Sequence, residues 1–212
     1  MTDGWSSRAE AYRESEAHRE GADLDLIVEW AAGERTALDV ATGGGHVARR
    51  LRDAGLEVVS CDPAPGMQPD VICRAEDLPF ADASFDIVCC RVAPHHFENV
   101  QAAVSEMARV SRDLVLVVDN LHAGARVEEA ERLRDPTHVR CYSEEEWRGV
   151  FEAAGLSVAA VERMDKEIEL EPWLARAGCL GDEAEQVKAL LADRIGGGRL
   201  TLPRIALKGS TS

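Results

Sequence analysis

From residue 37 onward, short apolar runs alternate with segments whose apolar positions recur at helical spacing. Between the third and fourth runs lies one such helical face, with spacings of three and four: Val100, Val104, Met107 and Val110. Continuous apolar strands joined by crossover helices are typical of a parallel sheet that is covered on both faces, so the pattern predicts a doubly wound α/β fold. The predicted strands are residues 36–41, 56–62, 84–92 and 113–119, with a helix at 46–54.

The second half of the chain is predicted to hold longer helical stretches. Gly155 is a natural helix stop, Ser143 and Glu146 have the spacing of a capping box, and Trp147 falls on an apolar stripe typical of a core. Pro203, within the last apolar run, indicates an edge strand or a bulge. Helices are expected at about 123–155 and 172–194, strands at 156–164 and 199–208, and a glycine loop at 196–198.

Length and composition favour one soluble domain. The chain has 212 residues, of which 45% are hydrophobic and 30% charged, so one substantial core is the expectation. No apolar run approaches the roughly 20 residues that a membrane-spanning helix needs. The N-terminal stretch is polar and acidic, unlike a signal peptide, which predicts a cytoplasmic location.

The charge and the cysteines narrow the function classes. A formal net charge of −15 argues against extended binding to a phosphate backbone, so no nucleic acid is expected and small-molecule partners are favoured. The six cysteines lack the CxxC pairing of zinc sites, and most lie in apolar runs, where a reduced thiol serves as a small core residue. No metal site is predicted.

A glycine-rich turn follows the first predicted strand in "DVATGGGHVA", residues 39–48. Such a strand-to-helix turn lets backbone N–H groups approach a ligand closely, and suits either a pyrophosphate or an amino-acid carboxylate. Asp62 ends the next strand, 19 positions after Gly43, where a carboxylate can accept hydrogen bonds from a ribose diol. Together these residues favour a cofactor that contains adenosine. Asp39 favours the charged amino-acid reading, since a dinucleotide-binding strand usually stays apolar up to its glycines.

With Asp39, the glycine segment resembles the first motif of class I S-adenosylmethionine-dependent methyltransferases. The resemblance continues through "CDPAPGM" at the second strand and "RAEDLPFADASFDIVCCRVAPHHF" around the predicted strand at 84–92. Two further segments, "AYRESEAHREGADLDLI" and "RLRDPTHVRCYSEEEW", are similar to elements of the ubiquinone and menaquinone C-methyltransferases, in the same order and with similar spacing. The match extends over nearly the whole chain.

The resemblance implies a Rossmann-like, mostly parallel seven-stranded sheet with helices on both faces and an antiparallel final strand. It implies one methyltransferase domain, with a helical lid at 1–33, a cofactor-binding core at 34–120 and substrate-side elements at 121–212. The expected activity is methyl transfer from S-adenosylmethionine to a small-molecule acceptor. The resemblance does not specify which atom of the acceptor is methylated, nor whether the protein is a monomer or a homodimer. The implied cofactor-binding residues are Asp39, Ala41, Thr42, Gly43, Gly45, Asp62, Pro63, Met67, Ala75, Glu76 and Arg91.

Two departures from the family pattern concern the adenine side. Relatives generally carry an Asp that takes the adenine amino group, and Arg74 stands at that position, where it cannot accept a hydrogen bond. Adenine contact is therefore expected from the Ala75 N–H or from Glu76. The segment between Asp62 and Val71 is also too short for the usual intervening helix.

Several side chains are candidates for the acceptor side. Methyl transfer is an in-line displacement, so a base is needed only where the nucleophile carries a proton. His95 and His138 are the catalytic candidates, the first after a strand end and the second in a segment that the resemblance places over the site; packing and turn roles are the alternatives. The substrate or lid candidates are Tyr12, His18, His96 and Trp173.

Two other functions use the same architecture. A non-catalytic cofactor-binding protein is kept open by Arg74 and the shortened adenine side. An NAD-dependent oxidoreductase is disfavoured by Asp39 and by the absence of a Tyr-x-x-x-Lys pair from the sequence.

Overall fold

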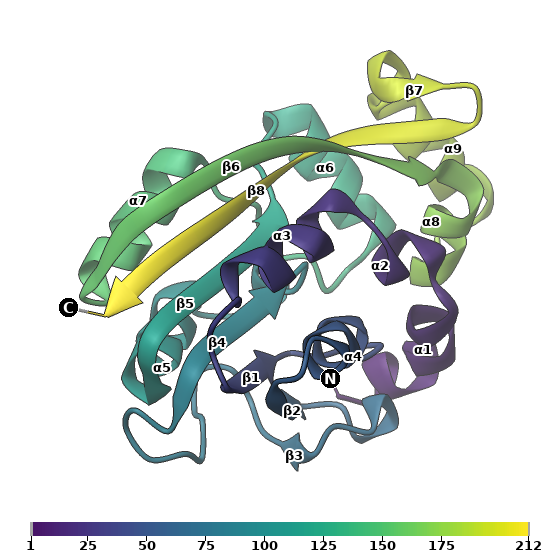
Figure 1. Cartoon of the computed structure of the whole chain (residues 1–212). Coiled ribbons are helices and arrows are strands. Elements are labelled where there is room, and N and C mark those ends of the chain that lie inside the picture. The colour runs from purple at the N-terminus through teal and green to yellow at the C-terminus, as the bar shows by residue number, and fades with distance from the viewer. Residues whose placement is uncertain (1, 212) are drawn as a thin grey trace.

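The computed structural model describes residues 2–211. Within that range the main sheet follows the order β3-β2-β1-β4-β5-β8-β6, and the two-residue β7 pairs with β8 beside this path. The first five strands are parallel, and β8 runs antiparallel to both β5 and β6. This is the predicted Rossmann-like sheet with an antiparallel final strand (Figure 1). The strands are β1 Thr36–Val40, β2 Glu57–Asp62, β3 Val71–Ile72, β4 Phe85–Arg91, β5 Ser111–Asn120, β6 Leu156–Glu169, β7 Ile195–Gly196 and β8 Arg199–Thr211.

Helices cover both faces of the sheet. One face carries α5 and α7, whose Met107, Trp147 and Phe151 are fully buried. The other carries α3 and α4, whose Leu24 and Leu51 are fully buried. The helices are α1 Thr2–Glu14, α2 Glu16–Arg19, α3 Ala22–Trp30, α4 His46–Asp53, α5 Val100–Val110, α6 Ala125–Arg134, α7 Glu144–Ala153, α8 Leu170–Ala177 and α9 Gly181–Leu190, with short 3-10 turns η1 Pro65–Met67, η2 Pro94–His96 and η3 Ala192–Arg194.

The long β6–β8 pair carries a second hydrophobic cluster at its far end. There α6, α8 and α9 pack together beside the strands (Figure 1). The predicted strand at 156–164 was too short, because β6 continues to Glu169 opposite Arg199. Pro203 lies at an edge position, as predicted, although no bulge occurs there. Pro203 pairs with Asp165 of β6, and it lies just beyond Arg204, the last residue of β8 that pairs with β5.

Local sequence signals explain where the helices begin and end. Ser143 and Glu146 form the predicted capping box at the start of α7. The helical stretch expected at 123–155 breaks between α6 and α7, where Pro136 lies. The stretch expected at 172–194 breaks after α8 at Gly178, which has a φ of 76° that favours glycine.

Two expectations from composition can be compared with the structure. All six cysteines are free thiols; five are buried and Cys73 is half-buried, as the core-thiol interpretation predicts. Among residues 2–211, no helix combines the length and the apolar character that crossing a membrane requires.

Candidate active site

A cleft of about 340 Å³ opens at the carboxyl ends of β1, β2 and β4. This is the edge at which open α/β sheets bind ligands. Helix α1 and the loop at 136–139 also contribute to its wall. Most of the predicted site residues line it: Tyr12, His18, Asp39, Ala41, Thr42, Gly43, Asp62, Pro63, Met67, Ala75, Glu76, Arg91, His96 and His138.

Asp39 organises the glycine turn from within. Its buried carboxylate accepts hydrogen bonds from the Thr42 hydroxyl at 2.5 Å and from the Ala48 N–H at 3.0 Å, which fixes both sides of the turn. Burial raises the pKa of Asp39 to about 6. Gly43 has a φ of 50°, and a Cβ there would meet nothing within 4 Å, so its backbone borders open space. The turn can therefore bring bare backbone against a ligand.

Gly44 was missing from the predicted site, although it lines the cleft. A Cβ at Gly44 would lie 2.7 Å from the carbonyl oxygen of Tyr12, so a side chain there would displace α1. Gly45 does not line the cleft; it is the N-cap of α4, with a φ of 73°. The three consecutive glycines thus have three roles: Gly43 borders the cleft space, Gly44 leaves room for α1, and Gly45 is the N-cap of α4.

Asp62 joins the glycine turn to the turn after β2. One of its oxygens accepts from the Gly43 N–H at 3.0 Å, and the other accepts from the Ala64 N–H at 2.9 Å. Burial raises its pKa. Each carboxylate oxygen can accept a second hydrogen bond. Asp62 therefore keeps acceptor capacity at the wall of the cleft.

The connection after β2, on the side where the resemblance places adenine, is short. It holds only a 3-10 turn, η1, in agreement with the expectation that the segment between Asp62 and Val71 leaves no room for a helix. Arg74 points to the rim, where it forms ion pairs with Glu76 at 3.4 Å and with Glu98 at 3.0 Å. Ala75 is buried behind these charges. Arg74 therefore neutralises two acidic groups at the mouth of the cleft.

Arg91, the last residue of β4, lies in a buried charge cluster. Its Nε donates to the Asp23 carboxylate at 2.7 Å, and Arg204 donates to the same oxygen at 2.6 Å. Burial tends to raise the pKa of Asp23, but Arg204 and Arg91 outweigh that effect and hold it well below its usual range. Arg91 Nη1 donates to the carbonyl of His18, while its buried Nη2 has no partner within residues 2–211. A cation with a spare donor thus lies at the cleft.

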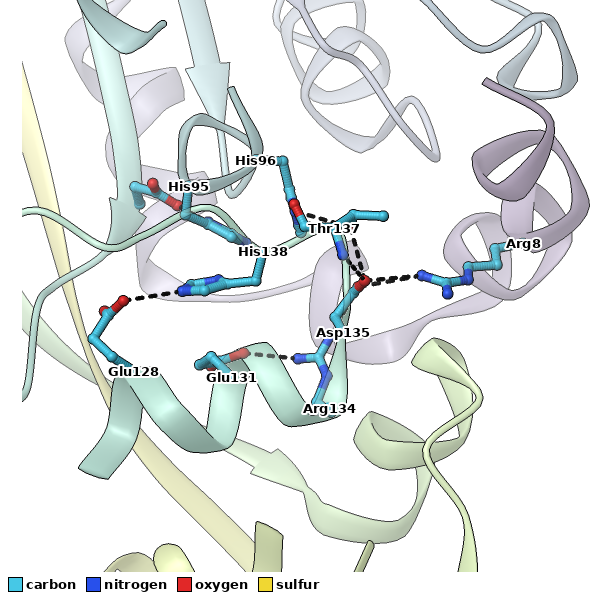
Figure 2. Close-up of polar contacts among 10 residues, drawn as sticks. Arg8, His95, His96, Glu128, Glu131, Arg134, Asp135, Thr137 and His138 are labelled. Atoms are coloured by element: carbon cyan, nitrogen blue, oxygen red, sulfur yellow. Dashed lines mark hydrogen bonds and ion pairs between the residues drawn. The ribbon is translucent and has the colours of Figure 1, made fainter. Parts of the chain in front are cut away.

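Helix α1 covers the cleft through several contacts. Figure 2 shows Arg8 reaching Asp135, with its Nη1 at 3.2 Å from both carboxylate oxygens. Arg13 donates to the Gly66 carbonyl at 2.9 Å. Trp5 packs edge-on against His96, with the ring centroids 4.8 Å apart. These contacts connect α1 to the end of α6, to η1 and to η2.

The predicted lid at 1–33 divides into two parts in the structure. Tyr12 and His18 line the cleft, and the rings of His18 and His46 are stacked 6.5 Å apart. Burial and the nearby Arg176 lower the pKa of His18 well below its usual value. In contrast, Leu24 and Ile27 of α3 are fully buried in the core. Only α1 and α2 are therefore placed to act as a lid.

The two catalytic candidates differ in position (Figure 2). His138 lines the cleft, and its Nε2 is 3.2 Å from the Glu128 carboxylate. His95 does not line the cleft, because its ring lies against Asp119 at the end of β5, with Nδ1 2.5 Å from a carboxylate oxygen. Burial lowers the pKa of His95 and raises that of Asp119 to about 7, so the His95 ring is neutral. His96 lines the cleft beside His138 and donates to the Thr137 carbonyl at 3.1 Å.

Trp173 lies outside the cleft, so the structure does not support a pocket role for it. It is 4% exposed within the second hydrophobic cluster, and the Arg134 guanidinium lies over its ring at 4.3 Å from the centroid. An aromatic residue on a helix after a proline gives no signal that separates a pocket from a core. Trp147 is fully buried, as predicted.

Comparison with known proteins decides the family. Residues 38–118 match the methyltransferase domain family. YcgJ of Bacillus subtilis, an uncharacterised methyltransferase, is 34% identical to this chain over 207 residues, which cover 86% of this chain and 82% of YcgJ. The chain belongs to the methyltransferase family. The resemblance to S-adenosylmethionine-dependent methyltransferases is thereby confirmed, and this methyltransferase is no longer a candidate NAD-dependent oxidoreductase.

Solved structures agree with this assignment. The crystal structure of YcgJ has a TM-score of 0.80 and 28% identity, and the match covers 89% of this methyltransferase and 97% of YcgJ. The demethylmenaquinone methyltransferase of Beutenbergia cavernae is 42% identical over 90 residues, only 38% of this chain and 37% of that enzyme. Another match is the geranyl diphosphate C-methyltransferase of Streptomyces coelicolor, solved with S-adenosyl-L-homocysteine. Its TM-score is 0.66 at 10% identity, and the match covers 90% of this chain and 77% of that chain, so the likeness is one of fold alone.

Proposed function

We propose that this methyltransferase binds S-adenosylmethionine in the cleft and transfers its methyl group to a small-molecule acceptor. The observation that carries the proposal is the convergence of three separate segments on one cavity. The glycine turn after β1, Asp62 at the end of β2 and the loop at 74–76 all line it. These are the segments that the family resemblance assigns to the amino-acid, ribose and adenine parts of the cofactor.

The residues present fit the cofactor. Gly43 borders open space, and Asp62 keeps acceptor capacity for a ribose diol. The buried Arg91 offers an unpaired N–H donor at the same wall, which suits a carboxylate. The cofactor supplies a methyl group on a sulfonium, and the role of the protein is to bind both partners, align them and exclude water.

The acceptor is assigned to the rest of the cleft. Its lining there includes Trp5, Phe97, Pro136 and Val139, together with His96 and His138. Aromatic and apolar walls with few polar groups are typical of sites for compact organic ligands. The cover by α1 and the net charge of −15 argue against a nucleic acid or another large anionic polymer. A small molecule with an apolar body therefore fits best.

Calorimetry with S-adenosyl-L-homocysteine tests the cofactor assignment, with NAD as the negative control. We expect binding of the first and none of the second, and the opposite pattern would refute the proposal. Mass spectrometry on a panel of small phenols, quinols, amines and thiols, incubated with enzyme and S-adenosylmethionine, then tests transfer by a gain of one methyl group. Tight cofactor binding with no methylation across that panel would favour the non-catalytic alternative.

A further inference from the structure

The side chain of Glu128 connects α6 to the segment that carries His138. One oxygen lies 3.2 Å from His138 Nε2, and the other accepts from the Cys141 N–H at 3.1 Å. Glu128 is only 6% exposed. Burial tends to raise its pKa, but the hydrogen bonds from His138 and Cys141 outweigh burial and lower it. Glu128 is therefore a carboxylate at neutral pH, and a carboxylate can only accept hydrogen bonds.

This contact determines which nitrogen of His138 carries the proton. Because Glu128 can only accept, Nε2 must be the donor, and in the neutral ring Nδ1 is then left with a lone pair. Nδ1 is buried and has no partner anywhere in the described chain. Buried polar atoms are nearly always satisfied, and His138 lines the cleft, so a ligand bound there could supply the missing donor.

The neighbouring histidines do not share this arrangement. The buried ring of His95 lies outside the cleft lining, with its Nδ1 hydrogen-bonded to Asp119. His96 lines the cleft, but its Nδ1 is hydrogen-bonded to a backbone carbonyl and not to a carboxylate. His138 alone among the histidines of the described range combines a place in the cleft, a carboxylate on one nitrogen and an unpaired second nitrogen.

We infer that Glu128 orients His138 so that its Nδ1 receives a proton from the acceptor, which places the acceptor among small molecules with a hydroxyl or N–H group on an apolar body. The inference rests on the proposed function. As the acceptor oxygen or nitrogen bonds to the methyl carbon, the sulfur–methyl bond breaks and the acceptor proton moves to Nδ1. The resulting histidinium faces the Glu128 carboxylate and then loses its proton to solvent. His138 is thus a catalytic residue, and Glu128 is a positioning residue.

The ¹⁵N chemical shifts of His138 test the arrangement without any acceptor. We expect the Nε2–H tautomer to dominate in the wild type by about tenfold or more, since hydrogen bonds to charged groups are strong. Glu128→Gln, which keeps the size and an acceptor oxygen, should reduce that preference. Glu131→Gln is the matched control, because Glu131 is a buried carboxylate on the same helix that accepts from Arg134 instead. An Nδ1–H tautomer in the wild type, or no change in Glu128→Gln, would overturn the proposal.

Kinetics with the first acceptor found by the panel provide a second readout. We expect His138→Ala to lower kcat by about 10²- to 10⁴-fold and Glu128→Gln by about 10- to 100-fold, with S-adenosyl-L-homocysteine affinity unchanged. Unchanged kcat in both variants would overturn the inference while leaving the proposed function intact. Failure of the wild type to bind S-adenosyl-L-homocysteine would instead remove the proposed function.

A competing occupant of this cluster is a metal ion. Ligand atoms of Glu128, His138 and Cys141 lie within 4.8 Å of one another. Zinc bound to these residues through His138 Nε2 would replace the hydrogen bond between Nε2 and Glu128. We expect elemental analysis of the purified protein to find no stoichiometric zinc. One zinc per chain, lost in Cys141→Ser, would overturn the orientation by Glu128.

Discussion

Replacing Asp62 with alanine would test the cofactor site most directly. The carboxylate is 7% exposed and accepts from two backbone N–H groups, those of Gly43 and Ala64. Alanine removes the acceptor for both donors and the acceptor proposed for the ribose diol. One or two lost hydrogen bonds to a buried diol cost on the order of 1.5–3 kcal/mol, which corresponds to about a ten- to a hundredfold loss of cofactor affinity.

Calorimetry with S-adenosyl-L-homocysteine measures this loss, and Asp70→Ala is its matched control. Asp70 lies in the same connection and also accepts from a backbone N–H, that of Ser60, at 2.8 Å. It lies outside the lining of the cleft, so its removal disturbs the loop without touching the proposed diol site. Unchanged affinity in Asp62→Ala, or an equal loss in both variants, would refute the assignment of Asp62 to the ribose.

The remaining predictions concern the lid and the glycine turn. Arg8→Ala removes the Asp135 contact, so the amides of α1 should exchange hydrogen about 5- to 30-fold faster, a difference of about 1–2 kcal/mol. We expect S-adenosyl-L-homocysteine to narrow this difference. Equal hydrogen exchange with and without this ligand would contradict a lid. Burial raises the pKa of Asp39 from 3.8 to about 6, so the folded state holds that proton more tightly and loses about 2–3 kcal/mol of stability as pH rises from 4 to 7. Asp39→Asn should lack this loss in urea unfolding at the two pH values, and parallel profiles would contradict it.

The hydrophobic pattern was sufficient to predict the main strands in the parallel part of the sheet. The strands predicted at 36–41, 56–62, 84–92 and 113–119 lie within two residues of β1, β2, β4 and β5 at either end. Strands buried on both faces are continuous apolar runs, which sequence shows directly. Beyond residue 164, β6 reads DKEIE on the edge of the sheet, and a segment in which four of five residues are charged gives no strand signal. Only pairing with β8 extends it.

Local spacing was enough to predict residues that line the proposed cofactor side, whereas the proposed acceptor side depends on contacts between distant segments. Gly43 and Asp62 are separated by one crossover helix, so their meeting follows from the fold class. No comparable rule predicts the contact between Asp23 and Arg91, or the one between Arg8 and Asp135, from the sequence. His95 was predicted to face the cleft because it follows the end of a strand. A residue in that position can instead turn its ring toward the next strand, as His95 does toward Asp119 of β5.

The charge run "EEAER" before the loop illustrates why composition hid part of the site. The charge run alone predicts a solvent-exposed helix face. In the structure, however, α6 buries three charged residues at a spacing of three: Glu128, Glu131 and Arg134. Burying three charged residues on one face is costly unless each has a partner, and each does: Glu128 holds His138, while Glu131 and Arg134 pair with each other. Asp135 then binds Arg8 of α1 and the Thr137 N–H in the loop. The two ends of α6 thus carry two different buried carboxylates: Asp135 holds α1, and Glu128 holds the residue proposed to take the proton.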